Sequence, residues 1–226
     1  MLKDFLYLLR IFLAYIIISI SCILMLRVIL SYSFFRDDVQ FLLLKIDYLN
    51  NKIWKTAFYI HVFSAVIALF AGFTQFSADF LKYNKKLHRI FGKIYVWNIL
   101  VINFPTAMIL AIYANGGLIG KTAFVILDIL WFYFTYVAFI CALKKDFINH
   151  RYNMIRSYAL TFSAITLRLW KIIILAFFAV DPAILYTIQS WLGFLPNLIV
   201  AELIIYYYKR NVKRLSVVYS DISTNK

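Results

Sequence analysis

The sequence is poor in loop-forming residues, in acidic side chains and in cysteine. Its 226 residues include six glycines, three prolines, two cysteines and ten acidic side chains. So little glycine and proline leaves no room for a long linker, and we expect one membrane domain over residues 1–226. Cys22 and Cys141 both lie inside apolar runs. That position argues against a disulfide framework of the secreted type.

Apolar side chains dominate what remains. The chain is 64% hydrophobic and 19% aromatic, with a mean hydropathy of +0.82. Soluble domains are about 45–50% apolar, so the composition predicts an integral membrane protein whose partner is the lipid bilayer. The net charge is +14, but lysine and arginine cluster between apolar runs and form no long basic arm. This pattern indicates membrane topology, and we expect no nucleic-acid partner.

Several apolar runs have the length of about 20 residues that a membrane-spanning helix needs. Breaks at Asn115-Gly116-Gly117 and Asp181-Pro182 separate neighbouring runs. The sequence therefore predicts an all-α fold, a six-helix transmembrane bundle. The expected helices cover residues 9–31, 54–77, 90–114, 122–143, 154–180 and 188–208.

Positive charge gathers in every second connection. By the positive-inside rule, both termini should be cytoplasmic, and we expect the protein in a bacterial inner (plasma) membrane as a multi-pass protein. The charges that decide this are Lys3 and Arg10, then Lys82, Lys85, Lys86, Arg89 and Lys93, then Lys144, Lys145, Arg151 and Arg156, and finally Lys209, Arg210, Lys213, Arg214 and Lys226.

The three histidines all lie on or beside predicted spans. His61 is in the second span, His88 opens the third and His150 precedes the fifth. His88 shares a helical face with Gly92, where the missing side chain could seat a flat macrocycle, with His150 as the opposite axial ligand. Neutral imidazole is a usual haem ligand, so haem b is the candidate cofactor and His61 a further candidate ligand. Histidines that cap helices or bind lipid phosphates are the alternative.

Metal sites and hydrolytic sites find less support. Neither cysteine stands at ligand spacing from a histidine, so we expect no metal site of the zinc type. No Ser-His-Asp order or Cys-His dyad can be assigned.

The fifth predicted span carries charge into its apolar run. Ser157, Thr161, Ala164, Arg168 and Lys171 follow at spacings of four, three, four and three, which places them on one helical face. A charge inside a bilayer costs about 2.5–3.5 kcal/mol, so Arg168 should face the bundle interior. The stripe is either a helix-packing surface or a buried site.

Other ionisable groups inside the spans need partners, because an unpaired buried charge is costly. We expect Glu202 to pair with Arg156. Asp128 should pair with Arg168 or Lys171.

Several of the histidines and arginines named above belong to longer sequence motifs. They are His61, Gln75-Phe76, His88-Arg89-x-x-Gly92-x-x-Tyr95, and Met-Ile-Arg-Ser-Tyr-Ala-Leu-Thr-Phe at residues 154–162. Together they resemble a family of predicted bacterial multi-pass membrane proteins catalogued as a domain of unknown function. The resemblance covers about residues 54–208. The family pattern has Trp before Met-Ile-Arg, where this chain has Asn153.

The resemblance implies an inner-membrane helical bundle with a polar site, and it supplies no reaction. A likeness to four-helix b-type cytochromes concerns the fold alone and does not establish function. The implied site residues are His61, Gln75, His88, Arg89, His150, Arg156 and Arg168, with Asn197 and Glu202 as the pair of the final helix.

Three functions follow from these residues. The first is haem- or quinone-linked electron transfer at a histidine-containing site, with a redox or membrane partner protein. There, His88 and His150 would face a common cytoplasmic-side cavity bordered by Gln75 and Arg156, with Glu202 nearby. The second is binding or transport of a small anionic solute or lipid headgroup. The third is a non-catalytic scaffold. The residues expected to bind a substrate are Gln75, Arg89, Arg156, Arg168 and Glu202.

Overall fold

The computed structural model describes residues 9, 12, 16, 19–20, 23–36, 38–73, 75, 81 and 83–224. Every regular element in these ranges is a helix, which confirms the all-α class. The chain folds into two compact units, Met1–Ala114 and Asn115–Lys226. Residues 10–11, 13–15, 17–18 and 21–22 of the predicted first span lie outside the described residues, and residues 23–30 are helical. Lys3, Arg10, Cys22, Phe76, Lys82 and Lys226 also lie outside them.

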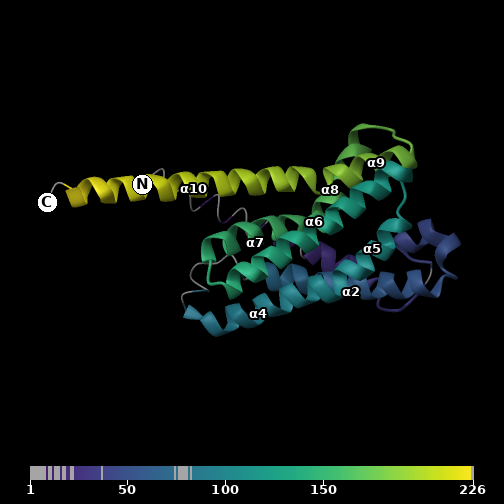
Figure 1. Ribbon diagram of the computed structural model, residues 1–226. Coiled ribbons are helices and arrows are strands. Elements are labelled where there is room, and N and C mark those ends of the chain that lie inside the picture. Colours follow the sequence, from purple (N-terminus) through teal and green to yellow (C-terminus); the bar gives the residue numbers. More distant parts are fainter. Residues whose placement is uncertain are drawn as a thin grey trace. The chain divides into compact units, whose positions relative to one another are not determined.

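The first unit is built on two long helices. α2 (Lys52–Phe73) packs against α4 (Lys85–Trp97), η3 (Asn98–Asn103) and α5 (Phe104–Ile112), and these elements lie side by side in Figure 1. α4, η3 and α5 form one continuous span. The middle piece is a π-helix because Pro105, at the start of α5, has no N–H to donate and its ring crowds the preceding turn.

A buried lysine fixes the 3-10 helix η1 (Gln40–Tyr48) to this unit. Lys45 is 2% exposed, and its Nζ donates to the carbonyl of Tyr113 at the end of α5. The same Nζ lies 5.1 Å from the centre of the Tyr48 ring and 5.8 Å from that of Phe41. A carbonyl and two aromatic faces thus solvate the buried cation.

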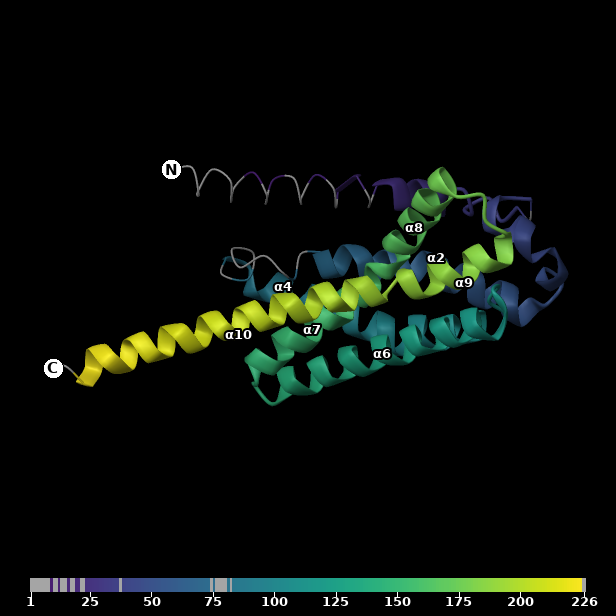
Figure 2. The same ribbon diagram turned by 90° about the horizontal axis from the view of Figure 1, so that it is seen from above.

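The second unit consists of two helical hairpins and a long final helix. α6 (Gly117–Leu143) and α7 (Phe147–Thr161) form the first hairpin. α8 (Ser163–Phe177) and α9 (Pro182–Leu192) form the second, and α10 (Leu195–Thr224) packs on α7. α10 continues past the ends of the other helices of its unit, as the views in Figures 1 and 2 both show.

Gly116 is required where the second unit begins. Its φ of 86° is left-handed, and a Cβ built on it would lie 2.9 Å from Thr187 Oγ1 and 3.0 Å from Thr187 N. The Thr187 hydroxyl donates to the Gly116 carbonyl at 2.9 Å, so this contact joins the start of α6 to α9. A glycine both permits the backbone angle and leaves room for the approach.

Four helices are long and apolar enough to cross a membrane: Lys52–Gly72, Lys85–Ile112, Gly117–Leu143 and Pro182–Arg210. α7 and α8 add a fifth span if the pair is counted as one, bent by 42° at Phe162. The predicted fifth span therefore exists as a broken helix, and the predicted third begins earlier, at Lys85. The six-helix count and the cytoplasmic position of both termini stay predictions.

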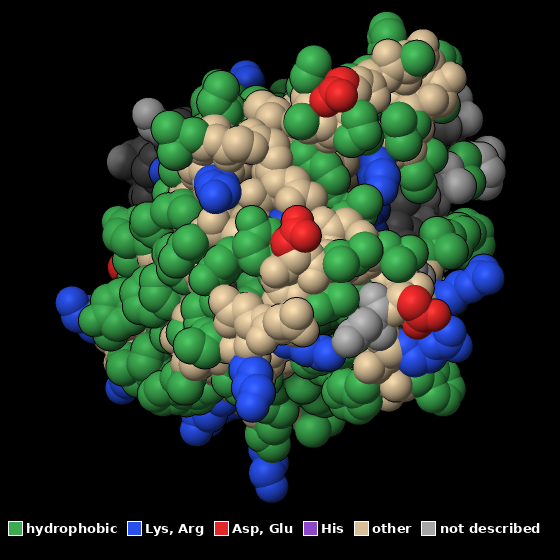
Figure 3. Space-filling view, turned by 90° about the vertical axis from the view of Figure 1, so that its right-hand side faces the viewer, with side chains coloured by type: hydrophobic (Ala, Val, Ile, Leu, Met, Phe, Trp, Pro, Cys, Tyr) green, Lys and Arg blue, Asp and Glu red, His purple; other side chains and the backbone are tan. Residues whose placement is uncertain are grey.

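The surface agrees with a membrane environment. Large apolar side chains such as Ile129, Ile172 and Leu203 are exposed along the spans. Apolar side chains also cover most of the face in Figure 3, with scattered charges between them. Soluble proteins rarely expose contiguous apolar patches of this extent.

Candidate functional site

A buried seam of polar side chains joins α6 to α7. Trp131 Nε1 donates to Thr161 Oγ1 at 2.9 Å, and the hydroxyl oxygens of Thr135 and Ser157 lie 2.6 Å apart. Thr135 and Ser157 are fully buried. Spacings of four on each helix place these groups on facing surfaces, and interhelical hydrogen bonds of this kind stabilise helix pairs in membranes. We call Trp131, Thr135, Ser157 and Thr161 the α6–α7 seam.

His150 lies at the other end of this helix pair, in the first turn of α7. Asp146 caps that helix by accepting from Asn149 N at 3.1 Å. The half-buried imidazole has its Nδ1 2.8 Å from the carbonyl oxygen of Ala138 on α6. A carbonyl only accepts hydrogen bonds, so Nδ1 carries the hydrogen and the neutral ring keeps its lone pair on Nε2.

The predicted pair of Arg156 and Glu202 is confirmed. Arg156 Nε lies 2.5 Å from Glu202 Oε1, and Nη2 lies 2.9 Å from Oε2, which makes a two-pronged bond between α7 and α10. The guanidinium also lies 5.5 Å from the centre of the Phe134 ring. The carboxylate compensates the positive charge of Arg156 inside the second unit.

The predicted interior position of Arg168 is wrong. Ser157 and Thr161 are buried, but Arg168 is exposed, and its Nη1 lies 2.5 Å from the Ala164 carbonyl of its own helix. The 42° bend at Phe162 is the physical reason, because it turns α8 off the axis along which the stripe was projected. The stripe is therefore interior only in its α7 half.

The predicted partner of Asp128 is also missing. Asp128 is 3% exposed on the face of α6 that carries the seam, and its Oδ2 has no hydrogen-bond partner in the described part of the chain. No ion pair joins it to Arg168 or Lys171 among the described residues. The bend at Phe162 also accounts for this difference, since both cations lie beyond it.

Two asparagines form the polar centre of the first unit. Ser64 Oγ donates to Asn103 Oδ1 at 3.1 Å, and Asn98 Nδ2 donates to the Ser64 carbonyl at 2.7 Å. Both asparagines are buried. The wider turn of the π-helix brings residues five apart onto one face, and Asn103 Nδ2 donates to the Asn98 carbonyl at 3.3 Å.

The space beside Gly92 is filled by a side chain of this same unit. A Cβ on Gly92 would lie 3.2 Å from Gln75 Oε1. The glycine therefore admits the Gln75 amide, and the predicted seat for a macrocycle on this face is wrong. His61 on α2 and His88 on α4 are half-buried, and Arg89 is exposed.

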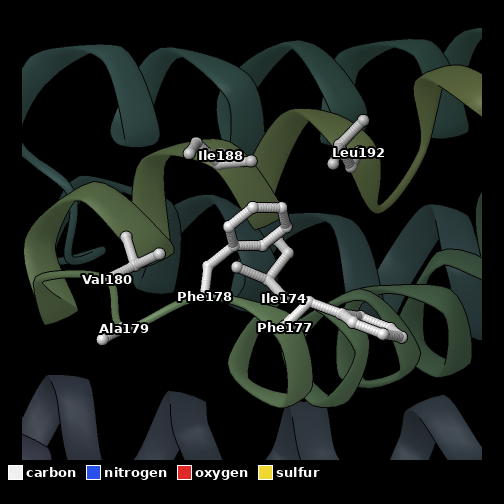
Figure 4. Close-up of a pocket in the computed structure, with 7 residues that line it drawn as sticks. All are labelled: Ile174, Phe177, Phe178, Ala179, Val180, Ile188 and Leu192. Carbon is white, nitrogen blue, oxygen red and sulfur yellow. The ribbon is translucent and has the colours of Figure 1, made fainter.

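An apolar cavity of about 590 Å³ lies between α8 and α9. Figure 4 shows that side chains from both helices and from their connection surround it. With no polar side chain in its lining, it suits a hydrocarbon chain and offers nothing to bind an anion. The lining residues are Ile174, Phe177, Phe178, Ala179, Val180, Ile188 and Leu192.

Comparison with known proteins gives one match. The family model described as "Predicted membrane protein (DUF2306)" covers residues 58–205. The chain belongs to the DUF2306 family. No curated protein and no solved structure matches it. All three histidines, Arg156 and Glu202 of this DUF2306 protein lie inside the matched region.

The fold brings together only some of the predicted site residues. Arg156 contacts Glu202 in the second unit, and Gln75 approaches the His88 helix at Gly92 in the first. His88 and His150 belong to different units, so their common cavity stays a prediction.

Sequence reasoning missed several polar positions that the structure makes prominent. These are Asn98 and Asn103 in the first unit, and Trp131 and Thr135 in the second. The available signal was the presence of two asparagines five residues apart within one apolar span, since amides there need partners.

Proposed function

We propose that this DUF2306 protein is a haem b protein of membrane electron transfer, in which His150 supplies an axial ligand. The observation that carries the proposal is the contact of His150 Nδ1 with the Ala138 carbonyl at 2.8 Å. Histidines that ligate metals donate their other ring N–H to a carbonyl or carboxylate in this way. When bound, haem would supply one-electron chemistry.

The surroundings of His150 hold the ring for that role. Asp146 fixes the start of α7, and the carbonyl of Ala138 accepts from Nδ1, so a neutral ring has its lone pair on Nε2. The ring as a whole is half-buried. The chain itself thus supplies an oriented imidazole at the start of α7.

The sequence offers His88 and His61, the two remaining histidines of the chain, as candidates for a second ligand. A quinone or a redox partner protein would exchange electrons with the haem. We place the protein in a bacterial inner membrane, with both termini on the cytoplasmic side, because of the charge pattern of its connections.

Binding of an anionic solute or headgroup has less support in the second unit. The guanidinium of Arg156 is bonded through two nitrogens to Glu202, which compensates its charge. Arg168 donates a hydrogen bond from Nη1 to the Ala164 carbonyl. An anion would have to displace these contacts before either cation could bind it.

The test is the absorbance spectrum of protein purified from cells supplied with haem precursor. We expect a Soret band in the wild type and its loss in His150→Gln, because glutamine can still donate to the Ala138 carbonyl but is not a haem ligand. Asn153→Ala is the matched control, since Asn153 lies one turn further along α7 and its amide bonds only to the Asn149 carbonyl. The control should keep the band.

Two results would overturn the proposal. One is a wild-type protein without a Soret band after haem supplementation. The other is an unchanged band in His150→Gln. His88→Ala and His61→Ala, measured in parallel, identify the opposite ligand by the loss of the same band.

A further inference from the structure

Asp128 is the one carboxyl group that the described residues hold deep inside a span without a cation. Of the ten acidic side chains of the sequence, Asp38, Asp146 and Asp181 are in exposed connections. Glu202 lies in a span but is bonded to Arg156. Asp128 is 3% exposed in the middle of α6, and no cation offsets it.

Asp128 lies on the same face of α6 as the α6–α7 seam. Asp128, Trp131 and Thr135 follow at spacings of three and four, so they share the buried face of α6. The seam groups are already engaged: Trp131 Nε1 donates to Thr161, and Thr135 donates to the Trp131 carbonyl at 2.7 Å. Thr161 Oγ1 donates to the Ser157 carbonyl at 3.2 Å.

The helices that pack on α6 bring no free positive charge to this carboxyl. α9 has no lysine, arginine or histidine. On α7, Arg156 is bonded to Glu202 and His150 to the Ala138 carbonyl, while Arg151 donates to Tyr208 Oη at 3.2 Å. An ionised carboxylate at Asp128 would therefore stand in an apolar interior without compensation, which is prohibitively costly.

We propose that Asp128 is a proton-binding site inside the second unit, where it holds one proton as a neutral carboxylic acid. The carboxylate takes up a single proton on one oxygen, which turns an acceptor-only group into a hydrogen-bond donor. Ionisable groups within spans are commonly the sites at which membrane proteins take up and release protons. This proposal does not rest on haem binding.

A proton suits this position better than a metal cation. Cations such as Ca²⁺ and Mg²⁺ need about six oxygen ligands around them. The described residues contain no group of three or more His, Cys, Asp or Glu that could hold a metal ion. Asp128 would stand almost alone as a ligand, whereas a proton needs only one oxygen.

Infrared spectroscopy of the reconstituted full chain at neutral pH tests the proposal. A protonated carboxylic acid gives a C=O stretching band that is separate from the bands of carboxylates, and ¹³C labelling of the aspartate side chains shifts it. We expect this band in the wild type and its complete loss in Asp128→Asn. Asp146→Asn is the matched control, because Asp146 is an exposed helix cap, and it should keep the band.

The outcomes are separable. Absence of the band in the wild type would overturn the proposal without need of any variant, and so would its persistence in Asp128→Asn. If the wild type shows the band in sodium-free buffer and loses it when sodium is added, the occupant is a cation and the proposal fails. Asparagine mimics a neutral acid, so Asp128→Asn should also fold with an unchanged unfolding midpoint.

Discussion

The hydroxyl pair of Thr135 and Ser157 gives the sharpest test of how α6 and α7 are held together. Thr135 has one hydroxyl hydrogen, which it gives to the Trp131 carbonyl at 2.7 Å. The Ser157 hydroxyl is then the donor across the 2.6 Å contact. Both side chains are fully buried, so removing either hydroxyl breaks this hydrogen bond between the helices without admitting solvent.

Thr135→Val keeps the shape of the side chain and removes this acceptor. We expect the free energy of unfolding to fall by roughly 0.5–1.5 kcal/mol, the usual net contribution of a hydrogen bond, because the bond to Ser157 is lost. Ser157→Ala should cost a similar amount. The double variant should cost less than the sum, with a coupling of about 0.6–1.7 kcal/mol.

The assay is unfolding of the four proteins by a denaturing detergent in bicelles. Thr122→Val is the control on the same helix, because Thr122 is exposed and donates only to the Leu118 carbonyl of its own helix, at 2.8 Å. It should change stability by less than about 0.5 kcal/mol. Additive effects of Thr135→Val and Ser157→Ala would refute the reasoning, since they would mean that the two hydroxyls do not interact.

Three further predictions concern backbone strain, capping and topology. Gly116→Ala should lower the free energy of unfolding by more than Gly117→Ala in the same detergent assay. Both residues have a positive φ, which costs alanine about 1–2 kcal/mol, but only a Cβ on Gly116 meets Thr187, at 2.9 Å; equal losses would contradict this. The Asn149 side-chain amide and backbone N–H lower the pKa of Asp146 below its ordinary 3.8. The cap therefore stabilises α7 fully at pH values above the ordinary pKa of 3.8, and this stabilisation is lost as the pH falls through the lower pKa of the folded state. The difference in thermal midpoint between wild type and Asp146→Ala should therefore shrink in acid. Reporter fusions at Gly116 and at the C-terminus should report opposite sides of the membrane, and signals from one side would rule out the predicted orientation.

Much of the architecture could be predicted because it follows from local sequence. Four of the expected apolar runs lie in helices long enough to cross a membrane, since a chain in lipid must satisfy its backbone hydrogen bonds within each segment. The Asn115-Gly116-Gly117 and Asp181-Pro182 breaks fell between helices as expected. Arg156 and Glu202 were matched correctly because a charge within a span has few possible partners of opposite sign.

The errors have a common origin in long-range geometry. Spacing alone continued the stripe from Thr161 to Arg168 along one straight helix, but the chain bends at Phe162 and Arg168 becomes exposed. Gly92 was read as a seat for a macrocycle because sequence cannot show which side chain fills a gap on a neighbouring helix, and Gln75 fills it.

Hydrophobicity and motifs are properties of the chain alone, and they were enough to identify a helical membrane protein of the DUF2306 family. The packing of the helices determines which polar groups are satisfied. It gave Ser157 a partner in Thr135 and fixed the tautomer of His150 through Ala138, and it left Asp128 buried without a cation. Those outcomes depend on how one helix packs against another. The hydrogen-bonding capacity of a residue does not by itself identify its partner on a neighbouring helix.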